Sequence, residues 1–353
     1  MDPDVLQASA RQMGFQAWDG QDELTGGRSQ TVVVWKRDQH FVLKAYDPAG
    51  PSAGAREQSA LHALDGASGT PRSLAEGVDP SWVLMSRLAG TGSLADALLG
   101  SDPEAARGAL LSWAEALARL HEAGTPQVRA AFRTALEGRA PHLDARSLPK
   151  DFTDAAAKLP RLLDELSLPG HEAALSVLQD LPARLAGEEW EVLSPADACP
   201  DNNLLDADGM RLLDFEFAEL RHAAWDVAYL RVPWPSCWCA WRLPDDVADE
   251  AVARYCSVRG AAAQESDFQE AIDLATMGWQ VMTSAHFIPG ALTDDDNART
   301  DRPSRRAFVL HRLGQAACTS PSNALTTLAG DLHGALRERW GDLRLDQAPS
   351  FRL

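Results

Sequence analysis

Short apolar runs rich in β-branched residues mark the first part of the chain. The runs Thr31–Trp35, His40–Tyr46 and Trp82–Met85 lie between turn-forming segments, so each predicts a β-strand. Residues 1–20 predict a helix followed by the start of a strand, and residues 55–64 carry apolar positions at helical spacing. The pattern therefore predicts a small antiparallel sheet with one helix.

From about residue 103 the pattern changes to the helical period. Apolar residues between Pro103 and Ala123 recur at helical spacing, and His121 and Gly124 mark the end of that helix. Residues 218–345 are expected to be largely helical, with loops at 232–244 and 289–302. Residues 125–190 are expected to form several helices interrupted at Pro141, Pro149, Pro160, Pro169 and Pro182. The fold class is therefore predicted to be α+β.

A polar segment, residues 193–216, interrupts the helical pattern. Leu204–Asp206 and Met210–Leu213 predict two short strands around Ala207-Asp208-Gly209. That loop is expected to be a three-residue hairpin turn in which Gly209 adopts a positive φ. A hairpin at this place returns the two ends of the segment to the same side.

Three polar residues flank this hairpin. Asn202 enters the first strand, Asp214 leaves the second, and Asp197 lies in the loop just before them. The hairpin thus gathers two carboxylates and an amide oxygen, which are ligands that Mg²⁺ prefers. Each residue alone also fits plain turn or cap chemistry, and only their combination favours a metal site.

A lysine and a glutamate upstream form a second candidate pair. Lysine is rare in this chain, and Lys44 lies in a mostly apolar strand. Glu57 falls one turn before Leu61 on the buried face of its helix, and an unpaired buried carboxylate is costly. Lys44 is the natural partner of Glu57, although a strand lysine alone is most often a surface residue.

Charge and composition narrow the classes of partner. The chain has 51 acidic and 33 basic residues, a formal net charge of −18. Such a balance argues against nucleic acid and against anionic membranes, and it would attract a cationic substrate. An acidic surface that serves solubility alone is the alternative. The absence of a long apolar run or a signal-like N-terminus, and an odd number of cysteines without metal spacing, favour a cytoplasmic protein with free thiols.

In this order the residues resemble the aminoglycoside phosphotransferase and choline kinase superfamily, whose fold is similar to that of protein kinases. The resemblance implies a bilobal α+β fold with a nucleotide-binding lobe of residues 1–88, a hinge near 86–92 and a helical lobe of residues 89–353. The helical lobe would carry the catalytic loop and the acceptor site. The matched segments are Leu24–Ser29, Val42–Lys44, Glu57, Leu84–Gly90, Leu117–His121, Asp197 with Asn202, Asp214–Glu216 and Trp225–Leu230.

The resemblance implies a nucleotide site in the first lobe. Lys44, held by Glu57, would grip the α- and β-phosphates of ATP or GTP. Backbone groups of Ser86 and Leu88 would meet the adenine edge. The nucleotide loop would include Gly26, Gly27 and Ser29.

It implies a catalytic and metal site in the hairpin segment. Asp197 would act on the acceptor hydroxyl as the catalytic residue, and Asn202 and Asp214 would hold Mg²⁺. Glu216 is expected to face away from Asp214 and to support either the loop or the metal, with structural support of the loop favoured. The implied activity is Mg²⁺-dependent transfer of a γ-phosphate to a cationic or hydroxylated small molecule, such as an aminoglycoside-like or choline-like compound. A monomer or homodimer is expected.

Two departures from the family pattern keep an alternative open. Ser194-Pro195-Ala196-Asp197 stands where the family usually has His-Gly-Asp, and Arg221-His222 replaces a Gly-Asp pair. The alternative is a catalytically weak or inactive kinase-fold protein that binds a nucleotide or another ligand. For the acceptor site the candidates are tryptophans and acidic residues of the second half, with core packing favoured for most of the tryptophans: Trp225, Trp234, Trp238, Trp241, Trp279, Asp245, Asp246 and Glu250.

Overall fold

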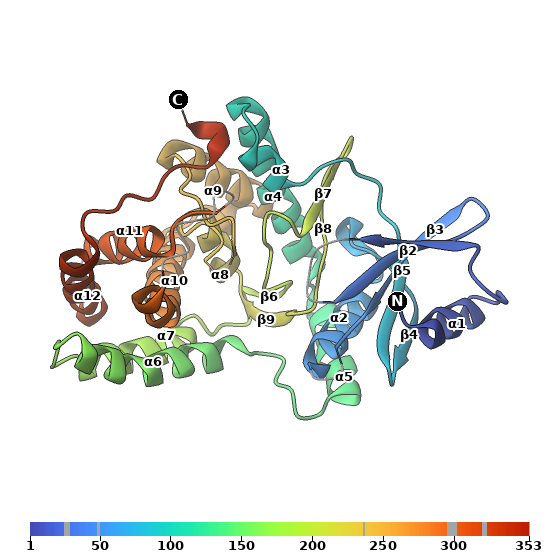
Figure 1. The fold of residues 1–353 in the computed structure, drawn as a ribbon, viewed down its shortest axis with the longest axis horizontal. Helices are drawn as coiled ribbons and strands as arrows, with labels where there is room; N and C mark the ends of the chain where they lie inside the picture. The colour runs from blue at the N-terminus through green and yellow to red at the C-terminus, as the bar shows by residue number, and fades with distance from the viewer. Residues whose placement is uncertain (25–28, 48–49, 236, 295–301, 320–322, 353) are drawn as a thin grey trace. The chain divides into compact units, whose positions relative to one another are not determined.

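The computed structural model describes the whole chain except residues 25–28, 48–49, 236, 295–301, 320–322 and 353 (Figure 1). The chain divides into two compact units. Unit 1 comprises Met1–Ser93, Ala116–Ala145 and Val192–Leu220, and unit 2 comprises Leu94–Glu115, Arg146–Glu191 and Arg221–Leu353. Among the described residues, no helix combines the length and the apolar character needed to cross a bilayer.

Unit 1 contains a five-stranded antiparallel sheet with the order β1-β2-β3-β5-β4. Its strands are β1 (Gly20–Leu24), β2 (Gln30–Lys36), β3 (Gln39–Ala45), β4 (Ser73–Val78) and β5 (Ser81–Ser86). The predicted strands correspond to β2, β3 and β5, so the expected antiparallel sheet is confirmed. The sequence reading did not find β4, in which a glycine and two polar residues weaken the strand pattern.

The two faces of this sheet serve different purposes. One face packs its buried side chains, including Val32, Leu43 and Trp82, against Val5 of α1 (Pro3–Gln12). Each such side chain contributes about 1.5–3 kcal/mol when fully buried. Successive residues of a strand point to opposite faces, so Lys44 lies on the face opposite Leu43. On that other side α2 (Pro51–Leu64) packs against β5 and against α5 (Pro126–Arg139).

The hairpin predicted between residues 203 and 213 is present, with a tighter turn than expected. Strands β7 (Asn203–Asp206) and β8 (Gly209–Leu212) pair so that Asp206 lies opposite Gly209. The connecting turn therefore has two residues, and the prediction of a three-residue loop is wrong. The Asp206 side chain accepts a hydrogen bond from the Asp208 N–H at 2.7 Å, which tightens the turn. Gly209 adopts φ +121°, as expected.

Unit 2 is built mainly from helices. Its central helix α10 packs against α6, α8 and α11, and α11 packs against α12. Two short strands, β6 (Glu191–Ser194) and β9 (Glu219–His222), pair with each other. The chain passes from one unit to the other within each of these strands. The helices are α3 (Leu94–Leu99), α6 (Leu148–Glu165), α7 (Glu172–Arg184), α8 (Ala224–Val227), α9 (Asp245–Arg259), α10 (Ser266–Thr293), α11 (Arg305–Ala317) and α12 (Ala324–Trp340), while α4 (Pro103–Ala123) runs from unit 2 into unit 1.

Three prolines that were expected in breaks or loops lie inside helices. Pro160 lies in α6, Pro182 in α7 and Pro289 in α10, so the helical breaks expected at these positions are wrong. A proline removes one backbone hydrogen bond and strains the preceding turn. In α6 the buried stripe continues across Pro160, from Leu159 to Leu162, and this packing outweighs the local cost.

Candidate active site

The Lys44 ammonium group lies among three carboxylates of unit 1. Its Nζ is 2.7 Å from Oε2 of Glu57, 2.7 Å from Oδ1 of Asp214 and 3.1 Å from Oε2 of Glu216. We call these four residues the Lys44 cluster. Lys44 comes from β3, Glu57 from α2, and the other two from the segment just after the β7–β8 hairpin. The predicted partnership of Lys44 and Glu57 is confirmed as a contact, and Asp214 joins it from 170 residues away.

Glu57 is the buried centre of this arrangement. Only 2% of it is exposed, yet both of its carboxylate oxygens accept hydrogen bonds. Oε2 accepts from Lys44 Nζ and from the Tyr46 hydroxyl, each at 2.7 Å, and Oε1 accepts from the Phe215 N–H at 3.3 Å. The burial cost of the carboxylate is thereby offset by three hydrogen bonds. Tyr46 and Phe215 were not singled out from the sequence, because a buried tyrosine or phenylalanine reads as core.

The cluster holds more negative than positive charge. Burial alone would lower the pKa of Lys44, but the carboxylates of Glu57, Asp214 and Glu216 outweigh burial and raise it. Burial, reinforced by Asp214, also raises the pKa of Glu57 despite the opposing effect of Lys44. The surplus of carboxylates thus acts in the same direction on both groups, while burial opposes the shift of Lys44 and is the main cause of the shift of Glu57. Such a site favours the binding of a further cation.

Glu216 lies where the sequence reading did not place it. Its carboxylate contacts Lys44 and accepts a hydrogen bond from the Ser29 hydroxyl at 3.2 Å, so the expectation that it faces away is wrong. Asp214 adopts φ +61°, which bends the chain and returns the Glu216 side chain to the same site. Carboxylate oxygens of Glu57, Asp214 and Glu216 lie within 4.8 Å of one another, a spacing suited to a hard cation.

Backbone hydrogen bonds hold Asp197 and Asn202 at the base of the hairpin. The Asn202 side-chain amide donates to the Asp197 carbonyl at 2.7 Å, and the Leu213 N–H donates to the Asn202 carbonyl at 2.9 Å. Leu213 immediately precedes Asp214, so the two ends of the hairpin are tied together as predicted. The Asp197 carboxylate accepts a hydrogen bond from the Cys199 thiol at 3.0 Å.

The loop before Asp197 has its own support. Ser194 is fully buried, and its hydroxyl accepts a hydrogen bond from the Ala196 N–H at 2.9 Å. Ala196 adopts φ +59°, a conformation that glycine adopts at little cost and alanine at about 1–2 kcal/mol. The sequence Ser-Pro-Ala therefore keeps the left-handed turn that a glycine would favour. The hydrogen bond from the Ala196 N–H to the Ser194 hydroxyl stabilises this turn.

The predicted nucleotide-binding residues are only partly described. Gly26 and Gly27 lie outside the described residues, while Ser29 contacts Glu216. The Ser86 N–H donates to the Arg72 carbonyl at 3.0 Å, so this group is already occupied. The backbone groups of Leu88 have no hydrogen bond to the described part of the chain. Leu88 can therefore offer both groups to a ligand.

The sequence of residues 21–265 matches the phosphotransferase enzyme family, which is well over half of the chain. The chain belongs to this family. The class of enzyme predicted from the sequence, a phosphotransferase with an alcohol group as acceptor, is confirmed at the level of the family. No curated protein matches this phosphotransferase in sequence.

Solved structures confirm the predicted protein-kinase-like α+β fold of the phosphotransferase. The ternary complex of APH(2")-IIa with streptomycin and ATP is 15% identical, with a TM-score of 0.53, and the match covers 82% of this chain and 93% of that one. Ethanolamine kinase of Plasmodium vivax is 12% identical, with a TM-score of 0.52 and coverages of 90% and 82%. Macrolide 2'-phosphotransferase MphH of Brachybacterium faecium is 16% identical, with a TM-score of 0.51 and coverages of 91% and 99%.

Most tryptophans of the phosphotransferase that were considered for the acceptor site are core residues. Four of these five tryptophans are each at most 6% exposed to solvent: Trp225, Trp234, Trp241 and Trp279. The fifth, Trp238, is 36% exposed. The preference for core packing is confirmed for these four. Of the acidic candidates, Glu250 forms an ion pair with Arg107 at 2.6 Å.

Arg221, which belongs to the Arg221-His222 pair that replaces the Gly-Asp of the family pattern, has a structural role in the phosphotransferase. In unit 2 the Arg221 guanidinium forms a buried ion pair with Asp226, which is completely inaccessible to solvent. The same guanidinium lies 5.7 Å from the ring centroid of Tyr229 and 5.8 Å from that of Trp279. Arg221 thus supplies the charge that allows the aspartate of the following helix to be buried.

Proposed function

We propose that this phosphotransferase transfers the γ-phosphate of ATP or GTP, with Mg²⁺, to a hydroxyl group of a small molecule that also carries an amine. The observation that carries the proposal is the Lys44 cluster beside the β7–β8 hairpin. It combines a buried lysine with a surplus of carboxylates, and the hairpin segment adds Asp197 and Asn202. Phosphoryl transfer depends on such positioning and charge neutralisation more than on covalent chemistry.

Lys44 would bind the phosphates of the donor nucleotide. Its ammonium group is fixed by Glu57, which is in turn fixed by the Tyr46 hydroxyl and the Phe215 N–H. A fixed cation orients an anionic ligand without losing side-chain freedom at the moment of binding. The unpartnered backbone of Leu88 would receive the base of the nucleotide.

The hairpin segment would hold the metal. Three carboxylates around one ammonium leave two formal negative charges, which a divalent cation neutralises, and all the donor atoms are oxygens. Asn202 and Asp214 would be the ligands, with Glu216 close by. Mg²⁺ supplies neutralisation of the charge on the phosphate oxygens.

Asp197 would orient the acceptor hydroxyl and accept its proton. General-base catalysis of this kind contributes about 10²–10⁴-fold to the rate. The Asp197 main chain is anchored by Asn202, so the residue proposed for the metal also positions the residue proposed for catalysis. The acidic balance of the chain suits an acceptor with a positively charged amine.

Calorimetric titration with Mg-ATP and Mg-GTP, followed by a coupled assay of nucleoside diphosphate release, tests the proposal. The acceptor panel consists of compounds that bear both amine and hydroxyl groups, such as aminoglycosides and choline-like amino alcohols. Asp197→Asn is expected to lower kcat by about 10²–10⁴-fold while leaving nucleotide affinity within about twofold, as a group acting only on the acceptor would. Asp208→Asn, in the exposed turn of the same hairpin, is the matched control and should retain full activity.

The outcomes separate the proposal from its alternative. Nucleotide binding without turnover on any acceptor, in the wild type as in Asp197→Asn, would support a ligand-binding protein in place of an active kinase. Absence of binding to either nucleotide in the presence of Mg²⁺ would refute both.

A further inference from the structure

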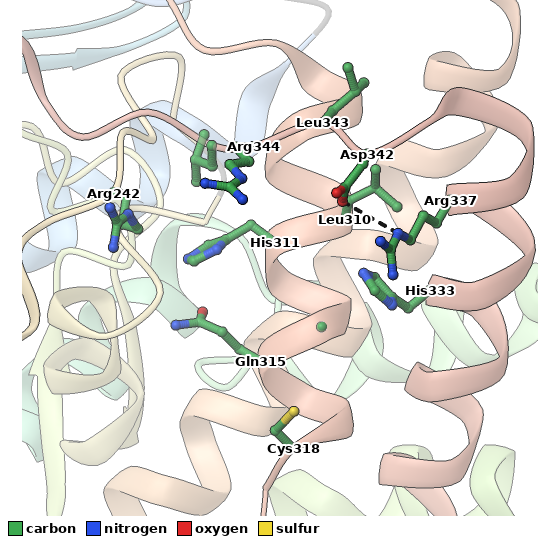
Figure 2. Close-up of a pocket in the computed structure, with 12 residues that line it drawn as sticks. Arg242, Leu310, His311, Gln315, Cys318, His333, Arg337, Asp342, Leu343 and Arg344 are labelled. Carbon is green, nitrogen blue, oxygen red and sulfur yellow. Dashed lines mark ion pairs between the residues drawn. The ribbon is translucent and has the colours of Figure 1, made fainter.

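A cavity lies wholly within unit 2, whereas the Lys44 cluster belongs to unit 1. Its volume is about 520 Å³, within the range of small-molecule sites in proteins. Figure 2 shows that its walls come from α11, from α12, from the segment after α12 and from Arg242. Nothing in the proposed phosphoryl transfer uses these residues.

The walls of this cavity carry an excess of positive charge. Three arginines, Arg242, Arg337 and Arg344, line it together with a single carboxylate, Asp342. Asp342 is engaged by Arg337, with 3.3 Å between Oδ1 and Nε. Two arginines are therefore left over, and they stand out against the −18 net charge of the chain.

Arg242 and Arg344 face the cavity without a side-chain partner among the described residues. The backbone position of Arg242 is fixed, because its N–H donates to the Asp346 carbonyl at 3.1 Å and its carbonyl accepts from the Ala348 N–H at 2.9 Å. A guanidinium group presents its donors in a planar fork that fits a carboxylate or a phosphate. The segment that carries Arg344 is pinned beside Arg242 by the same two hydrogen bonds.

Two neutral histidines, His311 and His333, also line the cavity. Burial, with the positive charges of Arg242 and Arg312, lowers the pKa of His311 to about 4, although Asp245 opposes the shift. Burial and Arg337 lower the pKa of His333. At neutral pH each imidazole can donate one hydrogen bond without adding charge.

The remaining lining is apolar. Leu310 of α11 and Leu343 of the segment after α12 form part of the wall, and 37% of Leu343 is exposed. Gly314 leaves space between the two helices, since a Cβ atom there would lie 3.4 Å from the His333 Nε2. The cavity thus combines unpartnered guanidinium groups with an apolar surface.

We propose that this cavity binds a small organic anion whose carboxylate or phosphate group is held by Arg242 and Arg344. The apolar body of the ligand packs against Leu310 and Leu343. A free inorganic anion would use only half of the site, because it leaves the apolar wall in contact with water.

Titration of the full chain at constant ionic strength with phenyl phosphate, benzoate and inorganic phosphate tests this proposal. At least one organic anion is expected to bind at least about tenfold more tightly than inorganic phosphate. Arg242→Ala and Arg344→Ala are each expected to weaken that binding by about 10- to 100-fold, as expected for the loss of a charged hydrogen bond. Arg339→Ala, on the exposed surface of α12 outside the cavity, is the matched control and should leave the affinity unchanged.

A spectroscopic measurement on the wild type keeps the test independent of the variants. The ring signals of His311 and His333 in the NMR spectrum should shift on addition of the organic anion, while those of His286 in α10, which does not line the cavity, should not. Absence of binding by both organic anions, equal affinity for inorganic phosphate, an equal loss in Arg339→Ala, or unshifted His311 and His333 signals would each overturn the proposal. These outcomes do not depend on nucleotide binding or turnover, so they leave the proposed function untouched.

Discussion

Replacement of Lys44 by methionine tests whether its ammonium group compensates the carboxylates around it. The substitution keeps most of the apolar stem but leaves Glu57, Asp214 and Glu216 without their shared cation. Removing one partner of a buried ion pair costs about 3–5 kcal/mol. Because the Asp214 side chain is 31% exposed and retains solvation, the lower end, about 3 kcal/mol, is expected here.

Urea denaturation followed by tryptophan fluorescence, in buffer with a chelator, measures this loss in the free energy of unfolding. Lys36→Met is the matched control, because Lys36 lies on the neighbouring strand β2 and forms an exposed ion pair with Asp19 at 2.6 Å. Exposed pairs contribute little to stability, so this variant should unfold close to the wild type. Equal stability of Lys44→Met and Lys36→Met would refute the compensating role of Lys44.

The destabilisation by Lys44→Met should also depend on pH. Burial already raises the pKa of Glu57 above its ordinary value of 4.5, and loss of the lysine raises it further. A carboxyl whose pKa is higher in the folded state stabilises the fold most at low pH, and this contribution is lost as pH rises through the folded pKa. The difference from the wild type should therefore be smaller at about pH 5 than at about pH 8. A difference that does not change with pH would contradict this account.

Three further substitutions have expected results that denaturation experiments can check. Ala196→Val should lower the free energy of unfolding by more than about 1 kcal/mol, because a branched residue tolerates φ +59° poorly, whereas Ala196→Gly should stay within about 1 kcal/mol of the wild type. Arg221→Met should cost about 3–5 kcal/mol by leaving Asp226 buried and unpaired, and a smaller loss in the Arg221→Met, Asp226→Leu double variant would confirm the pairing. Gly278→Ala should cost about 1–3 kcal/mol, since its Cβ would lie 2.8 Å from the Trp225 ring, and an unchanged transition would show that the helix yields there.

The Lys44–Glu57 contact could be predicted from the sequence because two local patterns converge on it. The apolar stripe of the helix placed Glu57 where burial demands a partner, and Lys44, a rare lysine in a mostly apolar strand, was the natural candidate. The contact of Glu216 with Lys44 could not be predicted in this way. It depends on the left-handed φ of Asp214, a conformation that aspartate tolerates but that glycine, which is absent there, would have signalled far more strongly.

The same limit applies to the backbone around the hairpin and the helices. The sequence indicated the hairpin and the positive φ of Gly209, but the turn length was decided by the pairing of Asp206 with Gly209. Prolines were read as helix breaks, although Pro160 lies inside α6, whose buried face continues past it, and Pro182 lies inside α7 as part of its buried face. In these cases the packing between segments far apart in the sequence outweighs the local preferences of turn residues and proline. The lobe boundary near residues 86–92 and the roles assigned to individual site residues stay predictions.

The hydrogen bond from the Phe215 N–H to Glu57 gives the lysine site an observable of its own. The same glutamate accepts from Lys44, and the amide belongs to the segment that carries Asp214 and Glu216. A backbone amide has a resolvable NMR resonance and a measurable rate of hydrogen exchange, which report local opening. The Phe215 amide can therefore monitor, in the intact protein and without any label on the ligand, whether the glutamate is still in place when a nucleotide or a metal ion binds.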